Sequence, residues 1–132
     1  MPIALSILPG MLSICRLSAD EAIPAWVGGG PFFSITRTEE ELSVVCGSAL
    51  VPAGVRAEDG WRALAVAGPL AFGLVGIVSD LSSALAAAGV SIFIVSTFDT
   101  DYVLVRAADL ARAVEALRAA GHRVDGEGQD AD

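Results

Sequence analysis

The sequence has no lysine, and its eight basic residues are arginines scattered along 132 residues that carry a net charge of −8. Charged residues make up only 18% of the chain. Binding to nucleic acid depends on clustered Lys and Arg side chains that neutralise phosphates. The sequence therefore argues against a nucleic-acid partner.

Histidine and cysteine are also scarce. His122 is the one histidine, and it follows the helix-ending Gly121, where we expect a surface position rather than a general base. Cys15 and Cys46 lie in apolar strand-like segments without the closely spaced further ligands that a metal needs. No nucleophile-elbow or phosphate-loop spacing is present. We expect no catalytic residue, no cofactor, no metal, and reduced thiols in the cytoplasm.

Two stretches lack charge altogether, residues 63–79 and 81–98, and each approaches the length of a membrane-spanning helix. The first contains one proline and three glycines, and the second contains Gly89 followed by a β-rich run. A helix–strand boundary within each stretch accounts for this pattern better than a spanning helix. The first ten residues have no basic region and break at Pro9-Gly10, which is not typical of a signal peptide.

The second half of the chain alternates between strand-like and helix-like patterns. Residues 61–67, 92–95, 102–105 and 122–125 are expected strands, and residues 70–88 and 107–120 are expected helices. The first helix would bury Leu74, Val78, Leu81 and Leu85. The resulting order, βαββαβ, is that of the ferredoxin-like fold.

The first half is shorter and poor in helix. Strands are expected at 3–8, 11–17, 32–37 and 41–46, with Pro9-Gly10 closing a hairpin and residues 49–60 forming a linker. Strand 3–8 would lie antiparallel beside strand 61–67. We therefore predict an α+β protein with two ferredoxin-like units whose antiparallel sheets lie side by side. The first unit (1–55) would be degenerate and permuted, the second (56–125) complete, and the tail (126–132) disordered.

The richest polar chemistry lies between the two apolar runs 92–95 and 102–105. Serine, threonine and aspartate side chains are concentrated there, at Ser96, Thr97, Asp99, Thr100 and Asp101. Such residues are ordinary at a hairpin turn. Carboxylates can also bind the ammonium of an amino acid, while a helix start such as the one after Gly68-Pro69 can bind its carboxylate. The pattern alone leaves both interpretations open.

Several segments resemble a known family. Residues 33–46, 60–62, 68–70 and 96–105 are similar to those of bacterial tandem ACT-domain proteins, which are related to the CASTOR-type amino-acid sensors. The resemblance covers about residues 1–125. It implies a regulatory module that binds an amino acid or a similar metabolite where paired ACT units meet. Because one chain holds two such units rather than four, some sites would require a homodimer.

The resemblance also implies which residues would contact the ligand. One side of the site would be lined by Ser34 and Ile35 of the first unit. The other side would be formed by Gly68, Pro69, Leu70, Phe72, Ser96, Thr97, Phe98 and Asp99. The chemistry of the hairpin tip adds Asp101, because either Asp99 or Asp101 could bind the ammonium of the ligand. The alternative is an interaction or oligomerisation module without a ligand, and a third possibility is an enzyme of the same fold. The sequence predicts no membrane partner.

Overall fold

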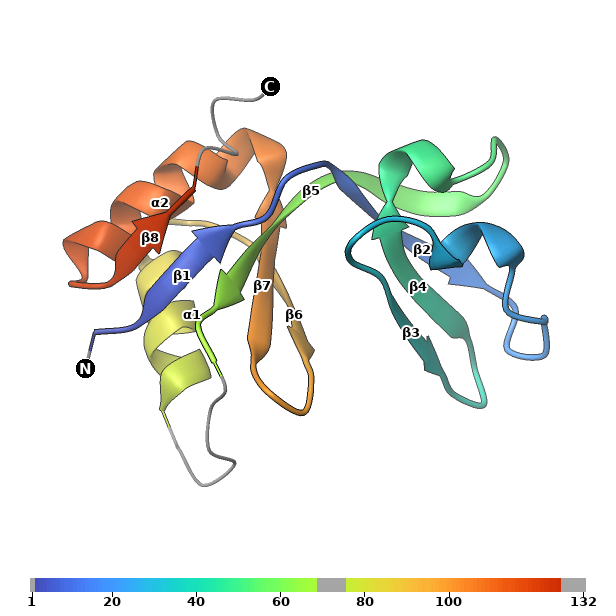
Figure 1. Ribbon diagram of the computed structural model, residues 1–132, viewed down its shortest axis with the longest axis horizontal. Coiled ribbons are helices and arrows are strands. Elements are labelled where there is room, and N and C mark those ends of the chain that lie inside the picture. Colours follow the sequence, from blue (N-terminus) through green and yellow to red (C-terminus); the bar gives the residue numbers. More distant parts are fainter. Residues whose placement is uncertain (1, 69–75, 127–132) are drawn as a thin grey trace. The chain divides into compact units, whose positions relative to one another are not determined.

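The computed structural model describes residues 2–68 and 76–126, which fold into two compact units (Figure 1). Unit 2 comprises Gly10–Trp61, and unit 1 takes the chain up to Pro9 and from Arg62 onward. The sequence predicted a single boundary at residue 55. In the structure the first strand of the chain belongs to the C-terminal unit, because it pairs with β5 (Arg56–Val66) and β8 (Arg123–Asp125). The α+β class is confirmed.

Unit 1 has the βαββαβ order that the sequence predicts, with one added strand. Its strands are β1 (Ala4–Ile7), the second part of β5 (Arg56–Val66), β6 (Ile92–Ser96), β7 (Asp101–Arg106) and β8 (Arg123–Asp125). Its helices are α1 (Ile77–Ala87) and α2 (Leu110–Ala119), the latter preceded by a 3-10 turn at Ala107–Asp109. Gly89 follows α1 with a φ of 76°, a left-handed conformation suited to ending a helix.

The added strand, β1, lies between β5 and β8, giving the strand order β8-β1-β5-β7-β6 (Figure 1). It runs antiparallel to β5, as predicted, with Leu5 opposite Val66, and parallel to β8. The predicted hairpin between β1 and β2 (Leu12–Leu17) is wrong. Instead, both strands pair with β5, β1 with its C-terminal part and β2 with its N-terminal part. Pro9-Gly10 therefore links two successive partners of one long strand.

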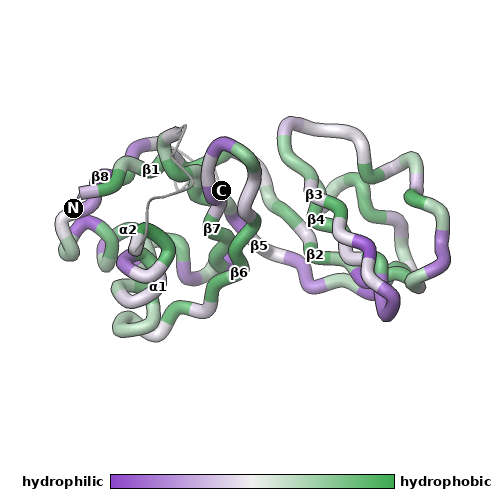
Figure 2. The backbone as a smooth tube through the Cα atoms, turned by 90° about the horizontal axis from the view of Figure 1, so that it is seen from below, coloured by the Kyte–Doolittle hydropathy of each residue, from purple (hydrophilic) through white to green (hydrophobic). Residues whose placement is uncertain are grey.

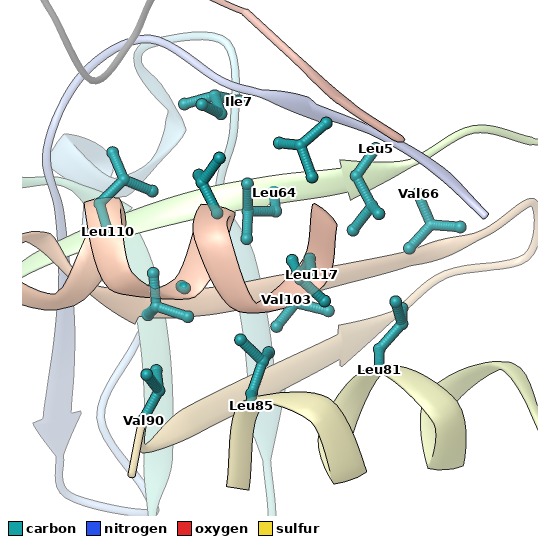
Figure 3. Close-up of a cluster of buried hydrophobic side chains, with 14 of the residues drawn as sticks. Leu5, Ile7, Leu64, Val66, Leu81, Leu85, Val90, Val103, Leu110 and Leu117 are labelled. Atoms are coloured by element: carbon teal, nitrogen blue, oxygen red, sulfur yellow. The ribbon is translucent and has the colours of Figure 1, made fainter. Parts of the chain in front are cut away.

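The core of unit 1 is formed between the sheet and both helices (Figure 3). Leu81 and Leu85 of α1 and Leu117 of α2 are fully buried against strand residues such as Leu64 and Val103. Shared burial in one cluster places both helices on the same face of the sheet. Figure 2 shows that hydrophobic residues lie along the strands, including β6 and β7. Val78 is 37% exposed, contrary to expectation, and the half-buried Ile77 packs against the core instead.

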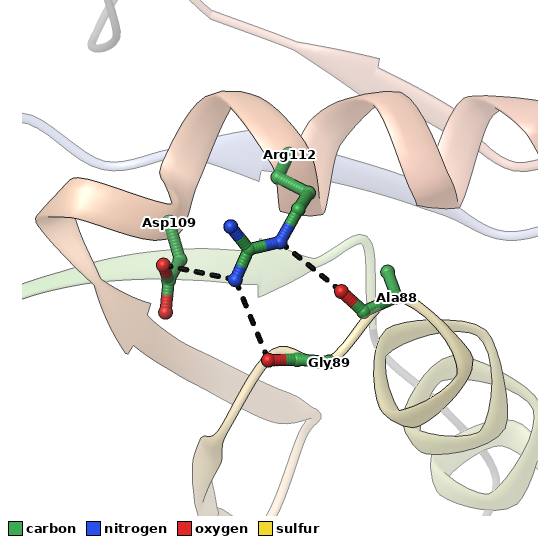
Figure 4. A network of polar contacts seen from close by, with 4 residues as sticks. All are labelled: Ala88, Gly89, Asp109 and Arg112. Carbon is green, nitrogen blue, oxygen red and sulfur yellow. Dashed lines mark hydrogen bonds and ion pairs between the residues drawn. The ribbon is translucent and has the colours of Figure 1, made fainter.

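Arg112 of α2 fastens the end of α1 (Figure 4). Its Nε donates to the carbonyl of Ala88 at 3.1 Å, and its Nη2 donates to the carbonyl of Gly89 at 3.4 Å. Asp109 holds the same guanidinium at 3.1 Å. Carbonyls at a helix end lack partners within the helix. Arg112 donates the hydrogen bonds that these carbonyls lack, and it thereby fixes the two helices to each other.

Unit 2 is a four-stranded antiparallel sheet in the order β3-β4-β2-β5. Its elements are β2 (Leu12–Leu17), the 3-10 turn η1 (Ala25–Gly28), β3 (Ser34–Arg37), β4 (Leu42–Gly47), the 3-10 turn η2 (Ser48–Leu50) and the first part of β5. Cys15, Val27, Leu42, Val44 and Cys46 form its core, with Trp26 packed alongside. Residues 10–61 are all described and contain no α-helix, as the sequence predicts for a helix-poor first unit.

Two further expectations need correction. Residues 56–60 are not a linker but the start of β5, where they pair with β2, and their charged side chains hid the strand pattern in the sequence. His122 is 8% exposed rather than on the surface, because its Nδ1 accepts a hydrogen bond from the backbone amide of Ile3 at 3.1 Å. None of the described helices is long and apolar enough to cross a membrane.

Candidate functional site

The tip of the β6–β7 hairpin is a tightly hydrogen-bonded turn. The backbone amide of Thr97 donates to the carbonyl of Thr100 at 2.8 Å. The hydroxyl of Thr97 donates to the same carbonyl at 3.0 Å and accepts from the amide of Thr100 at 3.3 Å. The tip therefore holds its shape through its own side chains, as the turn residues predict.

The two carboxylates of the tip have different surroundings. Asp101 accepts a hydrogen bond of 2.6 Å from the hydroxyl of Ser96, its neighbour across the two strands. Asp99 is exposed, and no described residue donates a hydrogen bond to its carboxylate. Of the two, Asp99 has more of its hydrogen-bonding capacity available for a ligand. Phe98 beside it is 79% exposed.

The tip is attached to the end of β5. Thr100 Oγ1 donates to the carbonyl of Val66 at 2.7 Å. Gly68 follows two residues later, and a Cβ placed on it would lie 3.0 Å from Thr100 Cβ and 3.1 Å from the carbonyl oxygen of Asp99. The absence of a side chain lets the backbone of residue 68 approach the turn closely. The structure thus brings the backbone of Gly68 close to Thr100 and Asp99.

The remaining predicted contacts stay predictions. Pro69, Leu70 and Phe72 lie outside the described residues. Ser34 and Ile35 lie in β3 of unit 2, where they pair with Val45 and Val44 and are half-buried. Their role stays a prediction of the resemblance.

The described residues give little support for catalysis. Burial raises the pKa of Cys15 to about 11, with the nearby Cys46 contributing, and burial also raises the pKa of Cys46. Reactive thiols have a lowered pKa, so neither cysteine is poised as a nucleophile. Among the described side chains, no group of three or more His, Cys, Asp or Glu residues could hold a metal ion.

Sequence reasoning missed a polar cluster beside a hollow in unit 2. The hollow measures about 490 Å³, and Ser48 and Asp59 contribute to its lining. The buried hydroxyl of Ser13 lies 2.7 Å from Ser48 Oγ and 2.6 Å from Asp59 Oδ1. The available signal was a serine within an apolar strand together with an Asp-Gly pair before Trp61. These residues are distant in sequence, and only the strand register joins them.

Two family models match the chain. The model described as ACT domain matches residues 56–119, and the model of an N-terminal domain matches residues 10–54. The boundary between the matches falls close to the start of β5. Residues 56–119 thus resemble an ACT domain.

Solved structures resemble the whole chain. The crystal structure of protein Atu0741 from Agobacterium tumefaciens is 49% identical, with a TM-score of 0.91, and the match covers 96% of this chain and 95% of that one. No curated protein matches.

More distant structures share the fold alone. A Vibrio cholerae protein of unknown function, described as a possible transport protein, is 18% identical with a TM-score of 0.74, and 89% of each chain is covered. The ligand-free regulatory subunit of aspartate kinase from Thermus thermophilus is 15% identical with a TM-score of 0.62, and the match covers 89% of this chain and 97% of that one.

Proposed function

Because this chain belongs to the family of the Agobacterium tumefaciens protein Atu0741 and resembles an ACT domain over residues 56–119, we propose that it is a non-catalytic regulatory protein. Its ligand would be an amino acid or a similar small metabolite. The relationship to CASTOR-type sensors is part of this proposal. The regulatory subunit of aspartate kinase, which has the same fold, supports such a role by analogy.

One observation carries the proposal. The hairpin tip holds the backbone carbonyl of Asp99, a residue whose side chain is exposed, close to the side-chain-free backbone of Gly68. A free amino acid needs an acceptor for its ammonium and backbone donors for its carboxylate. Asp99 is our candidate for the first role. The segment Gly68-Pro69-Leu70, which precedes the helix in the sequence, is our candidate for the second.

The further contacts in the proposal come from the sequence. Ser96, Thr97 and Asp101 lie at the same end of β6 and β7 and would shape the site around Asp99. The resemblance adds Ser34 and Ile35, together with Phe72 and Phe98. Assembly as a homodimer belongs to the proposal on the same basis. Two free buried cysteines support a reducing compartment such as the cytoplasm.

A thermal-shift screen against the proteinogenic amino acids tests the proposal. A ligand that binds only the folded protein stabilises it by about 2.7 kcal/mol when its concentration is 100 times the Kd. We expect one amino acid, or a few related ones, to raise Tm. Asp99→Asn should remove this shift while leaving the Tm of the ligand-free protein unchanged.

Asp20→Asn is the matched control, because Asp20 is an exposed carboxylate in unit 2. It should preserve the shift. No shift with any amino acid at millimolar concentration would count against ligand binding. If, in addition, light scattering finds a stable oligomer that Asp99→Ala and Asp101→Ala leave intact, the interaction-module alternative is favoured.

A further inference from the structure

We propose that unit 2 carries a second binding site, separate from the ACT site, for a small organic amine in the hollow beside Asp59. Every described residue that lines the hollow lies between residues 11 and 60, within this unit. Its volume of about 490 Å³ falls within the range of small-molecule pockets. The proposal goes beyond the amino-acid site and rests on different residues.

The direction of the hydrogen bonds determines what this site can bind. A carboxylate only accepts, so Ser13 must use its single hydroxyl proton on Asp59. Ser48 must then donate its own proton to Ser13. The chain Ser48 to Ser13 to Asp59 leaves lone pairs on Ser48 Oγ and on Asp59 Oδ2, to which no described residue donates. The site therefore offers acceptors and a negative charge, and its ligand must be a donor.

An irregularity in the sheet places Asp59 in this position. The register between β2 and β5 shifts between Leu12, opposite Trp61, and Ile14, opposite Glu58. Asp59 and Gly60 therefore both face Ser13, which is the pattern of a β-bulge. Gly60 has a φ of 82°, as a bulge glycine often does. Bulges redirect side chains and are common beside functional sites.

Apolar side chains also line the hollow. Its lining includes Met11, Val51, Pro52, Val55 and Ala57. Val51, Val55 and Ala57 also pack against the buried core of unit 2, which fixes that part of the wall. Met11, at 45% exposed, adds an adaptable apolar contact. An alkyl or aryl group could be buried here.

The site does not suit a free amino acid. None of the lining residues is Arg, Lys or His, and a ligand carboxylate would meet the charge of Asp59. An ammonium would instead form charge-assisted hydrogen bonds with Asp59 and Ser48. The arrangement thus selects an amine with an apolar body over a zwitterion or an anion.

The proposal is tested by titrating the protein separately with n-butylamine, 1-butanol and n-butyrate. Each titration is monitored through the NMR signals of the backbone amides. We expect butylamine to shift amides in residues 48–60 with saturation, and butanol and butyrate to bind at least about tenfold more weakly, because they lack the charge-assisted contact. Asp59→Asn keeps an acceptor for Ser13 but removes the charge, and it should weaken butylamine binding to a similar extent. Equal binding of butylamine and butyrate would overturn the proposal.

Two further variants keep the outcome decisive. Ser48→Ala removes one acceptor at the surface of the hollow and should weaken butylamine binding even if Asp59→Asn fails to fold. Asp99→Asn removes a carboxylate in unit 1 and should leave butylamine binding unchanged. Loss of butylamine binding in Asp99→Asn, with retention in Ser48→Ala, would reject the site in unit 2. The thermal-shift screen with amino acids tests the proposed role of Asp99 by a separate measurement. The amino-acid site and the amine site can therefore fail independently.

Discussion

Gly68 lies against Thr100, and a side chain at this position would require its neighbours to shift by a few tenths of an ångström. A Cβ at Gly68 would be 3.0 Å from Thr100 Cβ, which is tighter than nine in ten real Cβ contacts. Thr100 is itself tied to Val66 through its hydroxyl. The contact therefore couples the end of β5 to the turn that carries Asp99, the residue we propose binds the ligand.

Gly68→Ala should destabilise the protein by about 1–3 kcal/mol, because the new methyl group overpacks against Thr100 and the backbone of Asp99. Urea unfolding measures the loss. Gly28→Ala is the control, since a Cβ there meets nothing within 4 Å and its φ is ordinary. Equal stabilities of the two variants would contradict the close approach at Gly68.

Thr100→Val should cost about 0.5–1.5 kcal/mol, because it keeps the shape of the side chain and removes the hydrogen bond to Val66. Thr100→Ser retains the hydroxyl and should preserve most of the stability. Chemical denaturation of the three proteins checks this order. If the serine variant is the less stable, packing of the methyl group outweighs the hydrogen bond.

Leu85→Ala should lower the free energy of unfolding by about 2–5 kcal/mol, because it leaves a cavity in the core of unit 1. Val78→Ala lies on the same helix at a position that is 37% exposed, and it should cost less than about 1 kcal/mol. Thermal and urea unfolding provide the comparison. Similar losses would mean that α1 buries a different face.

The cysteines predict an alkaline loss of stability. The pKa of Cys15 rises from an ordinary value of 9.0 to about 11 on folding, so the native protein keeps a proton that the unfolded chain releases. The contribution is fully present below about pH 9 and disappears as the pH rises to about 11. Unfolding free energy should fall over this window, and the fall should be smaller in Cys15→Ala. An unchanged slope in that variant would exclude Cys15 as the source.

Much of unit 1 could be predicted from the sequence. Helical spacing identified Leu81 and Leu85 as core residues, and β-branched runs identified β6 and β7 with the turn between them. These patterns are local, because a helix or a hairpin arises between residues near one another in the chain. The hydrogen-bonding residues of the hairpin tip were recognisable for the same reason.

Other features depended on contacts between distant segments. Val78 was assigned to the core because periodicity alone does not fix where the buried stripe of a helix is centred. His122 was expected at the surface, yet it accepts from Ile3, 119 residues away. The preference for Asp99 over Asp101 required the position of Ser96 across the hairpin.

The sequence by itself determined the fold class, the βαββαβ order of elements and the turn chemistry, because local propensity and periodicity encode them. Only the tertiary structure decided which strands β5 pairs with, why residue 68 is a glycine, and how Ser13, Ser48 and Asp59 meet. Strand register and a single bulge set those positions. They result from pairing between segments dozens of residues apart, which no local pattern specifies.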